Sequence, residues 1–188
     1  MHGSDCGKGD SDNVNERNSL KPSRTAGKLR IPAPAAAFFL TALLLTVLYM
    51  ILGFYPFGDH SVMTSDLAAQ YAPDLVAFKQ KLLSGGNLSY SFLIGMGKNT
   101  LGLFAYYLAS PLNFVTFLFP ADGISEAILL LITLKLSLAS AFMTLFLRKR
   151  FHTVSGYSVL FGFLYAVSSY TMVFMINIMW LDGFFLLP

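Results

Sequence analysis

Long apolar runs alternate with more polar segments along this chain of 188 residues. The run 33–55 carries no charge and is long enough for a helix that crosses a hydrocarbon core of about 30 Å. A cleavable signal peptide would have a shorter apolar region of about 7–15 residues. The runs 127–147 and 157–180 have the same character, apart from one lysine. The pattern predicts an all-α polytopic membrane protein with three spanning helices.

A fourth apolar run, 101–119, is interrupted by Ser110 and Pro111. If this run crossed the membrane, the basic triplet 148–150 would emerge outside, whereas such residues favour short cytoplasmic loops. Proline removes a backbone donor and disfavours helix at the residue before it. We therefore expect 101–119 to be broken and to lie at the outer membrane interface or to re-enter the bundle.

The polar segments that flank these runs define the expected domain organisation. Residues 1–30 are too polar to bury a core, which predicts a disordered cytoplasmic tail before a transmembrane domain, 31–188. The first helix then leads outward, and 56–126 forms an external loop that carries the interfacial segments. A new apolar run begins at Phe184, which favours the N-terminal part of a longer protein.

Composition and charge agree with a membrane location. Hydrophobic residues make up 55% of the chain and charged residues 12%, about half the charged fraction of soluble domains. The net charge of +3 is too small to indicate a nucleic-acid partner. The single cysteine, Cys6, excludes an internal disulfide.

The external loop contains one clear amphipathic helix. Pro73 suits the first turn of a helix, so we expect a helix over 73–83 that ends at the Ser-Gly-Gly-Asn turn, 84–87. Its apolar face consists of Leu75, Phe78 and Leu82, and its polar positions are Asp74, Lys79 and Lys81. Such a helix is suited to lying on the membrane surface.

Asp66 is the first candidate for chemistry, and Asp59 is the second. A carboxylate at the membrane boundary could accept a proton from a hydroxyl nucleophile or bind a divalent cation. The competing interpretations are structural: Ser65 and Asp66 cap a helix, and Asp59 closes a turn. One histidine, His60, and scattered acids do not define a metal site, so the sequence indicates no metal and no other cofactor with certainty.

Lys135 is unusual because it lies inside a predicted span, where ionisable groups are costly and usually face a cavity or a partner. Two interpretations are open. The ammonium group could hold a lipid phosphate near the outer face. Alternatively, it could form a structural pair, for example with Asp182.

Several short motifs together resemble the bacterial YfhO family of membrane proteins over about residues 50–188. They are Tyr-Pro-Phe-Gly-Asp (55–59), Thr-Ser-Asp-Leu (64–67), Gln-Tyr-Ala-Pro (70–73), Lys-x-Lys-Leu-Leu-Ser-Gly (79–85), Ala-Tyr-Tyr-Leu-Ala-Ser-Pro-Leu-Asn (105–113) and Trp-Leu-Asp (180–182). The resemblance implies a multi-pass protein of the bacterial cell membrane. It also implies a GT-C-like transmembrane helix bundle, the architecture of one class of glycosyltransferases.

By this resemblance the protein would transfer a sugar from a polyprenyl-phosphate carrier to a cell-envelope polymer, such as lipoteichoic or wall teichoic acid. GT-C enzymes keep an essential acid in the first external loop, and Asp66 matches that position best, with Asp59 next. Gln70, Tyr71 and Lys135 would then bind substrate. Family members are much longer, so we expect this segment to be inactive by itself.

Two other function classes remain open from the sequence. A transporter or flippase of lipid-linked sugars would depend on Lys135 inside the membrane and not on the acids of the loop. A non-catalytic scaffold in a complex that builds envelope polymers would depend on neither.

The expected orientation is directly testable by cysteine labelling in cells. With Cys6 replaced by serine, a cysteine at Ser61 is expected to react with a membrane-impermeant maleimide on intact cells. A cysteine at Lys149 is expected to react only after permeabilisation, because the basic triplet stays in the cytosol. The reverse pattern would contradict the orientation.

Overall fold

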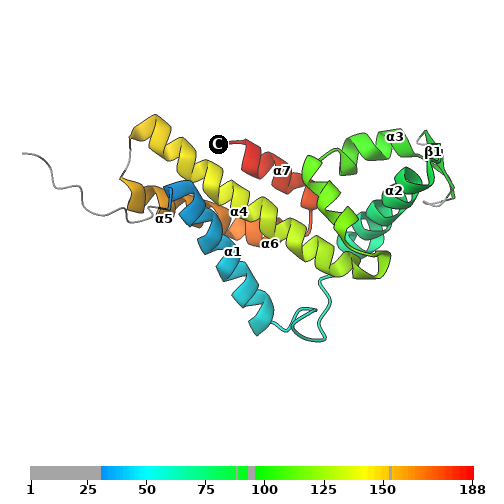
Figure 1. Ribbon diagram of the computed structural model, residues 1–188, viewed down its shortest axis with the longest axis horizontal. Helices are drawn as coiled ribbons and strands as arrows, with labels where there is room; N and C mark the ends of the chain where they lie inside the picture. The colour runs from blue at the N-terminus through cyan, green and yellow to red at the C-terminus, as the bar shows by residue number, and fades with distance from the viewer. Residues whose placement is uncertain (1–30, 88, 93–95, 153) are drawn as a thin grey trace, which may run out of the picture. The chain divides into compact units, whose positions relative to one another are not determined.

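The computed structural model describes residues 31–87, 89–92, 96–152 and 154–188, and the predicted tail 1–30 lies outside the described residues (Figure 1). Helices dominate, as predicted for an all-α membrane protein. The α-helices are α1 (Ala33–Ile51), α2 (Ala72–Ser84), α3 (Thr100–Leu103), α4 (Ile124–Phe151), α5 (Ser155–Ala166), α6 (Ser169–Phe174) and α7 (Ile178–Leu186). Four 3₁₀ or π segments are η1 (Leu67–Tyr71), η2 (Phe104–Leu108), η3 (Pro111–Leu118) and η4 (Ala121–Gly123). The strands β1 (Tyr90–Ser91) and β2 (Lys98–Asn99) pair antiparallel.

Three helical segments are long and apolar enough to cross a membrane: Ala33–Ile51, Ala121–Phe151 and Ser155–Phe174. Each overlaps one predicted span. The first ends before residue 55 because Gly53 adopts a left-handed conformation, with φ at +64°. The second is longer than predicted because Glu126 in its first turn and the basic triplet in its last turn both complement the helix dipole.

The third span differs from the prediction of one run over 157–180. The helix is interrupted after Ala166, where Ser168 adopts an extended conformation and precedes α6. It ends at Phe174, and a separate helix, α7, follows from Ile178. Trp180 therefore lies inside α7 and does not mark the end of the span.

The predicted break at Ser110 and Pro111 is confirmed. The helical stretches Thr100–Leu108 and Pro111–Leu118 meet at an angle of 99°. Ser110 is extended, with φ −70° and ψ 127°, as a residue before proline prefers. We call residues 109–111, which join η2 to η3, the elbow.

α4 lies in the middle of the helices, with α1, α5 and α7 beside it (Figure 1). α1 packs through a stripe spaced four residues apart, consisting of Ala33, Ala37, Thr41, Leu45 and Tyr49. Small residues let the backbones approach closely, and the Ser140 hydroxyl of α4 donates to the Ala37 carbonyl at 3.3 Å. The Thr144 hydroxyl similarly donates to Ser158 O of α5 at 3.2 Å.

The segment after α1 forms a layer around the N-terminal part of α4. α2 begins directly after the π segment η1, so the helical stretch starts at Leu67 and not at Pro73 as predicted. The Ala72 N–H bonds to Leu67 O, which is the wider π pattern and lets the stretch continue past a proline that has no N–H to donate. Gly85 ends α2 in the left-handed conformation, as the turn motif predicts.

The polar side chains of α2 do not form the exposed face that was predicted. The ammonium group of Lys79 donates to the carbonyls of Phe117 and Phe119, where η3 ends. The ammonium group of Lys81 donates to the carbonyls of Asn87 and Tyr90. Asp74, expected on the exposed face, is only 5% exposed. Both the apolar and the polar side chains of α2 thus contact the rest of the protein.

Gly162 of α5 allows the closest approach to α4, so we expect Gly162→Ala to destabilise the protein. An added Cβ would lie 2.6 Å from Ser140 O and collide with the Thr144 hydroxyl. Because one of these neighbours is backbone, we expect a loss of about 1–3 kcal/mol, measured by unfolding in lipid nanodiscs.

Gly156→Ala is the matched control on the same helix, since a Cβ there meets nothing within 4 Å. We expect it to be neutral or to stabilise the helix by up to about 1 kcal/mol. Equal effects of the two substitutions would contradict close α4–α5 packing at Gly162.

Candidate functional site

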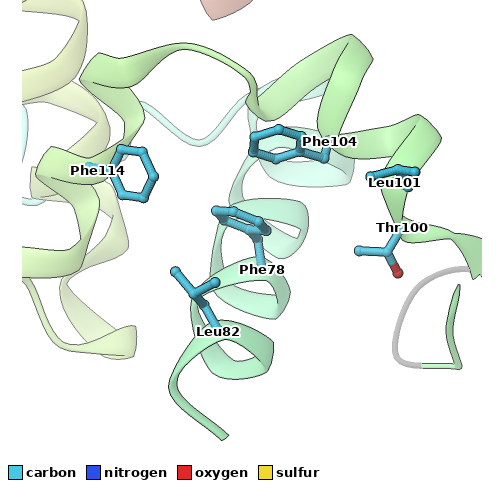
Figure 2. Close-up of a pocket in the computed structure, with 6 residues that line it drawn as sticks. All are labelled: Phe78, Leu82, Thr100, Leu101, Phe104 and Phe114. Carbon is cyan, nitrogen blue, oxygen red and sulfur yellow. The ribbon is translucent and has the colours of Figure 1, made fainter. Parts of the chain in front are cut away.

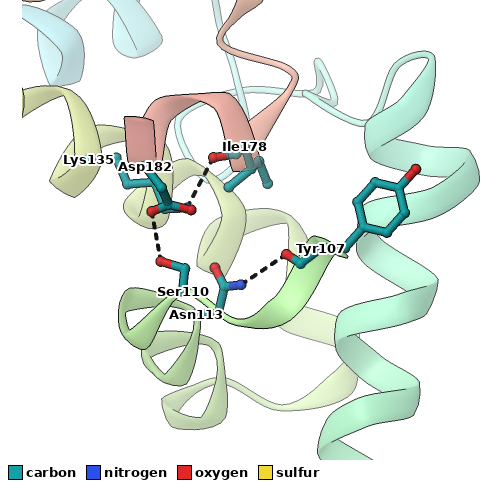
Figure 3. Close-up of polar contacts among 6 residues, drawn as sticks. All are labelled: Tyr107, Ser110, Asn113, Lys135, Ile178 and Asp182. Atoms are coloured by element: carbon teal, nitrogen blue, oxygen red, sulfur yellow. Dashed lines mark hydrogen bonds and ion pairs between the residues drawn. The ribbon is translucent and has the colours of Figure 1, made fainter. Parts of the chain in front are cut away.

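An ion pair between α4 and α7 lies at the centre of the candidate site (Figure 3). Lys135 is 1% exposed, and its Nζ lies 2.8 Å from Asp182 Oδ2. The same nitrogen donates to Ile178 O at 3.0 Å. A buried ammonium group requires such partners, since an unpaired charge there is strongly destabilising. Of the two interpretations of Lys135, the pair with Asp182 is the contact that the structure contains.

The second oxygen of Asp182 reaches the elbow. The Ser110 hydroxyl donates to Asp182 Oδ1 at 2.8 Å, and Figure 3 shows Ser110 directed toward the carboxylate. The sequence places this hydroxyl because Pro111 prevents a regular helix and leaves Ser110 extended at the bend. Asp182 thus connects α4, α7 and the elbow through its two oxygens.

Hydrogen bonds continue from the elbow toward η1. The Asn113 Nδ2 donates to Tyr107 O at 3.4 Å. The Tyr107 hydroxyl donates to Gln70 Oε1 at 2.8 Å, and its ring meets that of Tyr71 edge to face. Asn113 Oδ1 is buried and has no hydrogen-bond partner among the described residues. The predicted substrate residues Gln70 and Tyr71 therefore share Tyr107 as a neighbour.

A cavity of about 330 Å³ borders this network. Its walls come from η2, the elbow and α7, and the lining residues are Ala105, Tyr106, Tyr107, Ala109, Ser110, Pro111, Met179, Asp182, Phe185 and Leu186. The side chain of Asp182 is 24% exposed, whereas that of Lys135 has no exposed surface. The carboxylate is therefore accessible and its cationic partner is not.

Asp66 is half-buried at the start of η1. Its side chain makes no capping hydrogen bond to the described backbone, so the structure does not contain the cap that was the competing interpretation of this acid. The negative charge of Asp66 acts on Tyr71 and Tyr107, although burial is the main reason why both pKa values are raised. The pKa of Tyr71 rises to about 12, so its hydroxyl stays protonated at physiological pH.

Asp59, the second candidate, is exposed in the turn that follows α1. Backbone hydrogen bonds between Gly53 and His60 and between Tyr55 and His60 close this turn. His60 Nδ1 bonds Leu52 O at 2.7 Å, so this nitrogen is already used within the turn. The structure places Asp59 in a surface turn and Asp66 beside the tyrosines.

Asp74 is an acid that the sequence analysis assigned to the polar face. Burial raises its pKa, and the nearby positive charge of Lys98 partly offsets this shift. Its charge also acts on Tyr107. The spacing could have revealed its position, since Tyr71, Asp74 and Phe78 recur at intervals of three and four residues on one helix face.

An apolar cavity of about 240 Å³ lies between α2, the start of α3 and η3 (Figure 2). Its lining residues are Phe78, Leu82, Thr100, Leu101, Phe104 and Phe114. The rings of Phe78 and Phe104 stack with centroids 5.2 Å apart. Among the residues that the structure describes, no group of three or more His, Cys, Asp or Glu side chains could hold a metal ion.

The structure thus brings Gln70 and Tyr71 into contact with Tyr107, and it joins Lys135 to Asp182. The charge of Asp66 acts on both tyrosines. Tyr107 and Ser110 were not identified from sequence, and Asp182 was considered only as a partner of Lys135. The Ser-Pro pair could have identified Ser110 as a site residue, because a broken helix presents polar groups at its bend. The position of Tyr107 depends on the fold of the whole segment.

Comparison with known protein families matches the chain to the family described as bacterial membrane protein YfhO, over residues 36–188. The matched region begins in the first turn of α1 and includes α2 to α7. Comparisons with curated proteins and with solved structures gave no match.

The buried ion pair gives a stability prediction. Asp182→Asn leaves the Lys135 ammonium group buried without its counter-charge, and we expect the protein to lose about 3–5 kcal/mol of stability, measured by unfolding in nanodiscs. The double substitution Lys135→Met with Asp182→Leu removes both charges and is expected to recover most of this loss.

Ser110→Ala is a milder comparison, because it removes one hydrogen bond to the carboxylate and leaves the ion pair in place. We expect a loss of about 1.5–3 kcal/mol. An unchanged unfolding transition for Asp182→Asn would contradict the pairing of Lys135 with Asp182.

Proposed function

Because the chain belongs to the YfhO family of bacterial membrane proteins, we propose that it acts as a membrane glycosyltransferase. The proposed reaction transfers a sugar from a polyprenyl-phosphate carrier to a cell-envelope polymer such as lipoteichoic or wall teichoic acid. Asp66 carries the proposal. It is a half-buried carboxylate without a capping role in the segment that follows the first span, and its charge acts on the buried Tyr71 and on Tyr107.

Asp66 would act as a general base. In sugar transfer to a hydroxyl group, the hydroxyl oxygen attacks the anomeric carbon and the bond to the carrier phosphate breaks. A carboxylate within hydrogen-bond reach accepts the proton of that hydroxyl. Binding of a divalent cation is the other role open to this oxygen pair, since hard cations prefer carboxylate ligands.

The carrier would be held by apolar surface and by charge. The apolar cavity between α2 and α3 suits a hydrocarbon chain, because only Thr100 contributes a polar side chain to its lining. The predicted contact of Lys135 with the carrier phosphate stays a prediction, and it requires the pair with Asp182 to open, since both partners of Lys135 Nζ lie on α7.

A transporter of lipid-linked sugars is the second candidate function. The observation that favours it is the buried ion pair on a spanning helix, because intramembrane ionisable groups often line transport pathways. The two functions differ in their dependence on Asp66. A transporter needs no proton acceptor in the external segment, and a scaffold needs neither Asp66 nor the ion pair.

The test is Asp66→Asn in the full-length protein, expressed in cells that lack the natural copy. We expect incorporation of labelled sugar into the envelope polymer to fall by about 10²–10⁴-fold, the usual contribution of a general base. Membrane insertion and the unfolding transition are expected to stay unchanged, because the Asp66 side chain makes no capping hydrogen bond.

Asp122→Asn is the matched control, since Asp122 is an exposed acid of the same external segment. It is expected to keep full incorporation. Normal incorporation by Asp66→Asn would remove Asp66 from the mechanism. Normal transfer together with impaired movement of the carrier across the membrane in Lys135 variants would favour the transporter.

A further inference from the structure

The cavity beside Asp182 is lined by a carboxylate that is already paired with Lys135 and by aromatic side chains. Its volume of about 330 Å³ lies at the lower end of the range of small-molecule sites, roughly 300–1,000 Å³. One wall is polar and consists of Asp182 and Ser110. A second wall is aromatic and consists of Tyr106 and Tyr107. This arrangement suits a compact ligand that has both hydroxyl groups and an apolar face.

The polar wall has unused hydrogen-bonding capacity. Asp182 Oδ1 accepts from Ser110, and Oδ2 accepts from Lys135. An ionised carboxylate offers about four acceptor positions, so each oxygen retains one. The Ser110 hydroxyl donates its hydrogen bond to Asp182, and its oxygen can still accept hydrogen bonds. The wall can therefore receive hydrogen bonds from a ligand at both residues.

The charge of this wall selects the ligand class. The Lys135 ammonium group already balances Asp182, so the cavity has little net attraction for a metal cation. An anion such as a phosphate would meet the exposed carboxylate, while the cation behind it has no exposed surface. A neutral ligand rich in hydroxyl groups fits both conditions.

The aromatic wall completes the match. Tyr106 is 63% exposed, and its ring stands edge-on to that of Tyr107 with centroids 4.6 Å apart. The Tyr107 hydroxyl is held by Gln70, which fixes the ring. A tyrosine ring offers an apolar face together with a polar tip, and the C–H face of a pyranose ring can pack against such a surface.

We propose that this cavity is a carbohydrate-binding site, in which Asp182 and Ser110 accept hydrogen bonds from the hydroxyl groups of a neutral pyranoside while Tyr106 packs against its ring. Lys135 acts as a positioning residue that holds Asp182 in place. The inference deepens the proposed glycosyltransferase function by giving the sugar a place that is separate from Asp66.

The test measures binding directly, without a transfer assay. Methyl glucoside, methyl galactoside and methyl N-acetylglucosaminide are added to the full-length protein in lipid nanodiscs and followed by saturation-transfer difference NMR. We expect at least one pyranoside to bind. Ala109→Phe, which fills the cavity, and Tyr106→Ala, which removes the aromatic wall, are expected to weaken binding by about tenfold or more.

Neither variant changes Lys135 or Asp182, and the unfolding transition of each variant in nanodiscs separates a loss of binding from a loss of stability. Tyr157→Ala is the matched control, because Tyr157 of α5 is also 63% exposed and does not line the cavity. It is expected to bind like the unmodified protein. Absence of saturation transfer from all three pyranosides, or unchanged binding in both cavity variants, would overturn the proposal.

Further measurements separate this site from the catalytic proposal and identify the source of the sugar. Asp66→Asn is expected to keep pyranoside binding, so loss of transfer with retained binding distinguishes the two ideas. In the transfer assay, Ala109→Phe is expected to raise the KM for one substrate. A higher KM for the carrier-linked sugar assigns the site to the donor, and a higher KM for the polymer assigns it to the acceptor.

Discussion

The buried ion pair between Lys135 and Asp182 is the constraint on which the arrangement of the site depends. A charge inside a spanning helix must be paired, because the cost of an unpaired ammonium group is a large part of a protein's total stability. The partner lies on α7, and the same carboxylate receives the hydroxyl of Ser110. One residue of α4 therefore fixes α7 and the elbow. The elbow in turn fixes η2, and with it the ring of Tyr107.

Backbone groups released by breaks in the helices are satisfied by side chains from other segments. The carbonyls of Phe117 and Phe119 at the end of η3 accept from Lys79 of α2, and the Tyr107 carbonyl before the bend accepts from Asn113 of η3. Irregular backbone next to a membrane bundle requires such partners, since unpaired groups are costly where water is absent. The broken segment is thus held in place by these contacts, and it places polar groups such as the Ser110 hydroxyl at a cavity.

Two carboxylates stand out, and the two proposals give them different roles, Asp66 as proton acceptor and Asp182 as part of a place for the sugar. Asp66 stands at the start of η1, beside the buried ring of Tyr71, whereas Asp182 faces the cavity with its charge already balanced. Tyr107 touches both regions through Gln70, Tyr71 and the cavity wall. In the proposed glycosyltransferase, these two carboxylates differ in role because, among the described residues, only Asp182 forms an ion pair. The same difference explains why the ion pair would tolerate a neutral ligand and not an anion.

The sequence by itself determined the helical membrane architecture, three apolar helical segments and the break at Ser110 and Pro111. Those features follow from local hydropathy and from the chemistry of proline, which act within a few residues. Only the tertiary structure decided that Asp182 lies within reach of Lys135, that Asp74 is buried and that the run 157–180 is divided. These outcomes depend on contacts between residues far apart in the chain. Lys135 and Asp182 are 47 positions apart, and which acid an intramembrane lysine selects is set by how α7 packs against α4.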